Sequence, residues 1–133
     1  MLPNYLQALP QFLFYLGAGV LLLTLFWSLY TFLTPHDEIG LIRAGNASAA
    51  LLLVGALLGF LIPLVKAIAM HTTVMALAQW ALVAMLVQLA VYALLRLCWR
   101  GLHEDIMADR VAVALLCGFL SVAAGLINAA AMV

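Results

Sequence analysis

The sequence predicts an all-α membrane protein, a bundle of four transmembrane helices. The first observation is the composition: 69% of the 133 residues are hydrophobic and only 8% are charged. Soluble domains are about half apolar and about a quarter charged, so this composition excludes a water-soluble fold. The second observation is that the few charges separate four apolar stretches, each close to the about 20 residues that cross a bilayer.

The four stretches use most of the chain and leave two short loops. The expected spans are residues 12–33, 47–66, 74–96 and 111–132. Because the connections are short, consecutive spans should run antiparallel in an up-down bundle. We therefore expect a single membrane domain over residues 1–133, with any activity in the bundle or its loops.

Positive charges are distributed unevenly between the two sides of this bundle. The loop after the first span carries Arg43, and the loop after the third carries Arg96, Arg100 and Arg110. The opposite side has only Lys66 and the terminal amine. Cytoplasmic loops carry the excess of Lys and Arg, so both loops should be cytoplasmic and both termini should lie outside.

Charge and motifs also limit the function classes. The net charge is zero, whereas nucleic-acid-binding proteins carry a basic patch or stripe, so no nucleic-acid partner is expected. The sequence has no GxSxG, HExxH, P-loop or GxGxxG motif. We therefore expect no enzyme activity and no cofactor, and membrane lipid as the surroundings.

A unit of helix, acidic loop and small-residue helix occurs twice. Residues 36–39 (His-Asp-Glu-Ile) recur as residues 103–106 (His-Glu-Asp-Ile), 67 positions later. The first repeat is predicted to span about residues 10–68, and the second about residues 73–133. Each unit has an even number of spans, so the copies should be parallel and related by an axis along the membrane normal.

Small residues line one face of the second and fourth spans. In lipid, such residues let two helix backbones approach closely. This face allows three interpretations. The two spans pack on each other within one chain, or the face is an interface between subunits, or it lines a pore. Leu53 and Leu57 are expected to face lipid. The candidate packing residues are Ser48, Gly55, Gly59, Ala114, Gly118, Ser121, Gly125 and Asn128.

The acidic loops allow two interpretations. In the structural one, Thr34 caps a short helix over residues 35–44, with Pro35 at its first position and Gly45 at its end. In the functional one, the acidic residues converge and attract a cation or polyamine. Adjacent helical residues point in different directions, which is poor spacing for a metal, so no metal site is expected. The candidate loop residues are His36, Asp37, Glu38, Arg43, Asn46, His103, Glu104, Asp105 and Arg110.

Residues 35–47, with the sequence PHDEIGLIRAGNA, resemble the YjfL-like bacterial inner-membrane family. The acidic pair, the arginine and the Gly-Asn-Ala opening of the next span carry the resemblance, which extends over essentially the whole chain. It implies two tandem two-helix repeats, an inner-membrane location and no agreed activity, and with the charge count above it places both termini in the periplasm. Members are often encoded near polyamine-metabolism or membrane-stress genes. The second loop departs from the family, since residues 109–112 (Asp-Arg-Val-Ala) stand where Gly-Asn-Ala tends to recur.

Together these features favour a small integral inner-membrane protein that self-associates and acts through membrane assembly or a partner. The resemblance adds a possible membrane-stress or polyamine-linked context. The alternative is a small channel or transporter for an ion or polyamine, formed at an oligomer axis. A pore needs a continuous hydratable path, whereas an assembly unit needs only close helix packing.

Overall fold

The computed structural model describes residues 2–34, 37–70 and 73–132, and its secondary structure in these ranges is helical. The long helices are α1 (Leu2–Leu33), α3 (Ala47–Ala69), α4 (Val74–Cys98) and α6 (Val111–Ala131). The short helices are α2 (Glu38–Arg43) and α5 (Leu102–Met107). Each long helix is long and apolar enough to cross a membrane, so the prediction of four candidate spans is confirmed.

The first helix is longer than the sequence predicts. It begins at Leu2, upstream of the expected start at residue 12, and Pro10 lies inside it. Its 32 residues correspond to about 48 Å at 1.5 Å per residue. The hydrocarbon core is about 30 Å thick, so α1 must tilt or extend beyond it.

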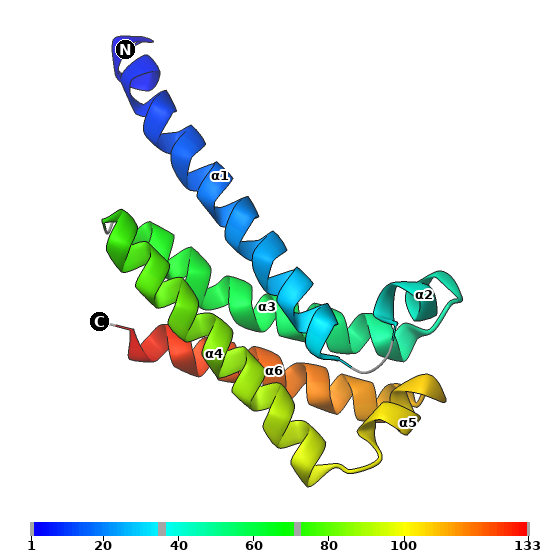
Figure 1. Cartoon of the computed structure of the whole chain (residues 1–133). Coiled ribbons are helices and arrows are strands. Elements are labelled where there is room, and N and C mark those ends of the chain that lie inside the picture. The colour runs from blue at the N-terminus through cyan, green and yellow to red at the C-terminus, as the bar shows by residue number, and fades with distance from the viewer. Residues whose placement is uncertain (1, 35–36, 71–72, 133) are drawn as a thin grey trace.

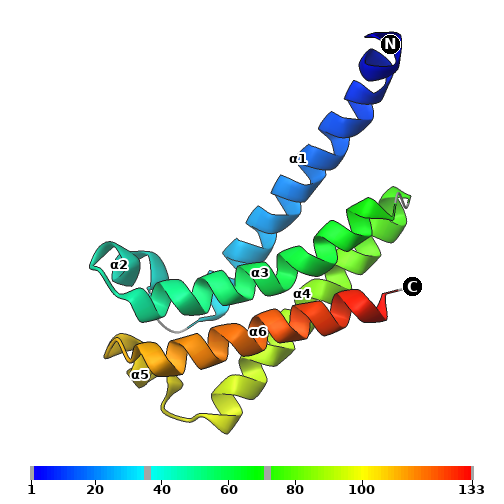
Figure 2. The same ribbon diagram turned by 180° about the vertical axis from the view of Figure 1, so that it is seen from behind.

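The long helices pack unequally. Helices α3 and α6 lie side by side, and α4 crosses against them, whereas α1 diverges from the others toward its N-terminal end (Figure 1, Figure 2). The four expected spans are present as helices, and α1 is the least buried of them. The helix is apolar all round, and of its described side chains Phe26 and Tyr30 are the buried ones. Without one small-residue face, α1 offers its neighbours little close backbone contact.

The short helices and the chain termini lie at opposite ends of the molecule. The short helices α2 and α5 lie at one end, and the N-terminal end of α1 and the C-terminal end of α6 lie toward the other (Figure 1). Each acidic loop thus begins where a long helix ends and leads into the next long helix.

Helix α3 is the centre of the core because two of its faces are buried. One face packs on α6, and the other carries Phe60, which stacks on Phe26 of α1 with ring centroids 4.6 Å apart. Leu53 belongs to this second face and is only 4% exposed, so the prediction that it faces lipid is wrong. Leu57 is half-buried against the same cluster. The exposed positions in this part of α3 include Val54 and Leu58.

Candidate functional site

The small residues of α3 and α6 form a seam within one chain, which we call the glycine seam. A Cβ atom built on Gly55 would meet the backbone of Gly118, and one on Gly125 would meet the carbonyl oxygen of Gly59. These positions have no room for a side chain, so the helices touch through their backbones. The glycines are occupied inside the chain and are not available to a subunit interface.

The remaining stripe residues extend this seam. Ser48 and Ala114 are fully buried, Ser121 is 4% exposed and Asn128 is half-buried. Gln88 of α4 joins the seam, because its Nε2 atom donates a hydrogen bond of 3.0 Å to the carbonyl oxygen of Ser121. A hydrogen bond of this kind satisfies a polar group that lipid cannot solvate.

The first acidic loop begins with a cap, at a different residue from the one expected. Asp37 is the N-cap of α2 and accepts a hydrogen bond of 3.2 Å from the Gly40 amide. Thr34 instead donates to the carbonyl oxygen of Thr31 in the preceding helix. The prediction of Thr34 as the cap is wrong because α2 begins only at Glu38. Pro35 and His36 lie outside the described residues.

Asn46 ties the first loop to the second. Its side-chain oxygen caps α3 by accepting from the Ala49 amide at 2.9 Å. Its side-chain nitrogen donates to the carbonyl oxygen of Ile106 in α5 at 2.8 Å. Asn46 is 8% exposed, so both hydrogen bonds are largely shielded from water. Arg43, the basic residue of this loop, is exposed in the last turn of α2.

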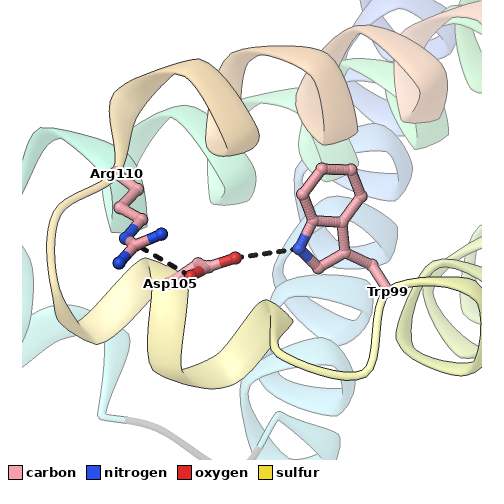
Figure 3. A network of polar contacts seen from close by, with 3 residues as sticks. All are labelled: Trp99, Asp105 and Arg110. Atoms are coloured by element: carbon pink, nitrogen blue, oxygen red, sulfur yellow. Dashed lines mark hydrogen bonds and ion pairs between the residues drawn. The ribbon is translucent and has the colours of Figure 1, made fainter.

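Asp105 is the most connected acidic residue of the second loop (Figure 3). The Trp99 indole nitrogen donates to Asp105 Oδ2 at 2.8 Å, and the Arg110 Nε atom lies 3.5 Å from Asp105 Oδ1. Of its neighbours, Glu104 is exposed and His103 is half-buried. Asp105 therefore acts within the loop, as a brace between the residues before and after α5.

Asp109 is a polar anchor that the sequence reasoning missed. Its Oδ1 atom accepts from both the amide and the hydroxyl of Ser48, at 3.0 and 2.8 Å. These two hydrogen bonds stabilise the carboxylate and lower the pKa of Asp109. The departure of residues 109–112 from Gly-Asn-Ala drew attention to Asp109. Nothing in the nearby sequence indicates that its partner is Ser48, 61 residues away.

Both short helices end in the same turn. Gly45 (φ 91°) and Asp109 (φ 58°) occupy the left-handed region. In each turn, one amide bonds three residues back and the next bonds five residues back, as in a Schellman motif. These turns correspond at a shift of 64 residues, from 45 to 109, whereas the acidic motif recurs at 67. The acidic pairs therefore do not occupy equivalent places: Asp37 is the N-cap of α2, whereas Glu104, its counterpart in the motif, lies inside α5.

Glu38 lies inside the molecule. It is 2% exposed, although the functional interpretation has it attract cations from solution. Its charge acts on Tyr30 of α1 and Tyr92 of α4, whose rings pack edge to face with centroids 5.3 Å apart. The sequence reasoning gave neither tyrosine a part in the loop, because the contact joins three helices that are distant in sequence.

The loop residues thus form a set of braces between helix ends. Among the described residues, no group of three or more His, Cys, Asp and Glu side chains is placed to hold a metal ion. Asp37 caps, Asp105 and Asp109 hold neighbouring segments, and Glu38 is buried. Hydrogen bonding between the loops is the chemistry that this arrangement supports.

Comparison with known proteins identifies the family. The model of the Domain of Unknown Function (DUF350) matches residues 4–132. The chain is 35% identical over 129 residues to the UPF0719 inner membrane protein YjfL of Escherichia coli (strain K12), covering 97% of this chain and 98% of that protein. The YjfL protein of Escherichia coli O157:H7 matches to the same extent. No solved structure matches the chain. With its four candidate spans, this multi-pass inner-membrane protein belongs to the DUF350 family.

Proposed function

We propose that this protein is a non-enzymatic assembly unit of the inner membrane, whose copies associate through α1. The observation that carries the proposal is an apolar groove of about 520 Å³ between α1 and the C-terminal half of α3. Its walls include Leu16 and Val20 of α1 and Leu61 and Ile68 of α3. Gln11 supplies an amide near one end.

The occupant that fits this groove is α1 of a second copy. The helix is apolar and largely exposed, with Leu16 at 53% and Leu21 at 68%, so each chain offers both a groove and a helix to fill it. Two small residues in the lining, Ala8 and Gly19, allow a close approach of helices in lipid. An exchange of equivalent surfaces around a two-fold axis closes after two copies.

The association is tested by the number of copies that purify together. We expect Leu16→Trp, which fills the groove, to convert the parent oligomer into a monomer, as measured by native mass spectrometry. The matched control is Leu21→Trp, since Leu21 is exposed but does not line the groove. A parent that is monomeric in both detergent and lipid nanodiscs, or equal loss in both variants, contradicts the proposal.

We place both loops of this unit in the cytoplasm and both termini in the periplasm. The support is the excess of arginine in the two loops. Reporter fusions after residue 133 test this orientation: a reporter that works only in the periplasm should be active there. Activity of a reporter that works only in the cytoplasm contradicts it.

The channel or transporter for an ion or polyamine stays a prediction with less support. It requires acidic side chains that are available to a passing cation. In the described loops, Asp105 and Asp109 are engaged by neighbouring residues, and Glu38 is buried. Asp37 and Glu104 are exposed, but Asp37 caps α2, and two loop carboxylates do not make a continuous path.

A further inference from the structure

A second groove lies at the loop end of the molecule, between the last turns of α1 and α4. Its volume is about 530 Å³. Its walls are mainly apolar, and its polar groups are a phenol and a guanidinium. The lining residues are Leu33, Leu89, Tyr92, Ala93, Arg96 and Leu97.

The polar groups of this groove are gathered on one face of α4. Tyr92 and Arg96 are four residues apart, so they lie one helical turn from each other. Both residues line the groove, so the guanidinium and the phenol border the same space. Arg96 is exposed, and no carboxylate is among the lining residues. Glu38, which acts on Tyr92, is buried and does not line the groove.

We infer that this groove binds an anionic phospholipid of the surrounding bilayer. The acyl chain would lie along the leucines and Ala93, and the phosphate would accept hydrogen bonds from Arg96 and the Tyr92 hydroxyl. A guanidinium matches a phosphate with two parallel hydrogen bonds. Positively charged pockets between helix ends on the cytoplasmic side are the usual places for anionic lipid headgroups. The groove is separate from the one between α1 and α3, so this inference does not depend on association through α1, although the cytoplasmic position of the groove rests on the orientation proposed above.

The first test compares two lipids and two arginines. The purified full chain is titrated with phosphatidylglycerol or phosphatidylcholine of the same acyl composition, and bound lipid is counted by native mass spectrometry. We expect phosphatidylglycerol to bind more tightly, and Arg96→Gln to weaken it about tenfold, the size of one hydrogen bond to a charged group. Arg100→Gln is the matched control, because it removes the same charge from a residue beyond the end of α4 that does not line the groove. Equal binding of the two lipids, or equal loss in both variants, overturns the inference.

The second test addresses the acyl chain and does not depend on removing a charge. Ala93→Trp fills the groove and leaves both arginines in place, so it should also reduce phosphatidylglycerol binding. Leu94→Trp is its control, since Leu94 is 59% exposed and does not line the groove. Circular dichroism of each variant confirms the helical fold before titration. Unchanged binding in the Ala93 variant, or displacement of the lipid by free glycerol phosphate, would assign the site to a headgroup alone and contradict the phospholipid.

Discussion

Helices α3 and α1 are both apolar helices that contain glycine, yet they pack in opposite ways. On α3, a Cβ atom at Gly59 would meet the Ser121 carbonyl oxygen, with the Gln88 Nε2 atom 2.5 Å away. On α1, a Cβ atom at Gly17 would have nothing within 4 Å. The presence of glycine in a span therefore does not by itself reveal a helix contact.

The spacing of the glycines explains the difference. Gly55 and Gly59 are four residues apart and lie on one face of α3, where α6 presents a matching row. Gly17 and Gly19 of α1 are two residues apart, so they lie on different faces. Lipid provides no hydrophobic force that would press an unmatched helix onto its neighbours. Close packing therefore forms where two matching rows meet, and α1 has no such row.

The largest effect is expected from a substitution that fills the glycine seam between α3 and α6. Gly59→Leu should lower the free energy of unfolding by about 3 kcal/mol or more, because the Gln88 side chain can move aside but the backbone carbonyl of Ser121 cannot. Denaturation of the purified protein with SDS, followed by circular dichroism, gives this energy. Leu58→Phe is the control, since Leu58 is 42% exposed on the same helix. If both variants unfold like the parent, the seam does not hold α3 and α6 together.

The loop contacts should contribute less to the free energy of unfolding than the glycine seam does. Asn46→Ala removes the cap of α3 and the hydrogen bond to the Ile106 carbonyl oxygen, which should cost about 2 kcal/mol in total. Asn46→Ser keeps a capping oxygen but does not reach Ile106, so about half of the loss should return. The same SDS titration measures both variants. Equal losses in the alanine and serine variants would show that the cap contributes nothing.

Local patterns in the sequence predict the helices and the small-residue contact well. Charges separate the spans, Gly45 marks the end of α2, and the spacing of Gly55 and Gly59 predicts a close helix neighbour. Each of these patterns lies within a short stretch of the sequence. They depend only on hydropathy, backbone conformation and helical period.

The arrangement of the loops could not be predicted in the same way. Asp109 binds Ser48 because α2 and α5 lie at the same end of the molecule, and Glu38 is buried there. Residues 61 positions apart carry no local sign of such a contact. The shift of 67 residues in the acidic motif also suggested an equivalence between loops that the turns, related by 64, do not have.

The anchor at Asp109 makes a smaller, pH-dependent contribution. Asp109→Gly removes the carboxylate and still suits the positive φ of 58°. Since the folded protein holds the pKa of Asp109 below its usual value of 3.8, the stabilisation is present above that value and is lost as the pH falls through the lowered pKa. The parent should therefore melt higher than the variant at pH 7, and the difference should begin to shrink near pH 4 and disappear below the lowered pKa. A difference that persists at low pH would assign the effect to the backbone.

The smallest effect is expected from a glycine-to-leucine substitution on α1, which is the counterpart of Gly59→Leu on α3. Gly17→Leu adds the same four carbons as Gly59→Leu, but into open space, so the free energy of unfolding should stay within about 0.5 kcal/mol of the parent. Gly17 does not line the groove between α1 and α3, so the copy number in native mass spectrometry should also be unchanged. A loss close to that of Gly59→Leu would mean that α1 packs against another helix at this position. In that case the contrast between the two helices would describe one isolated chain and not the protein in its membrane.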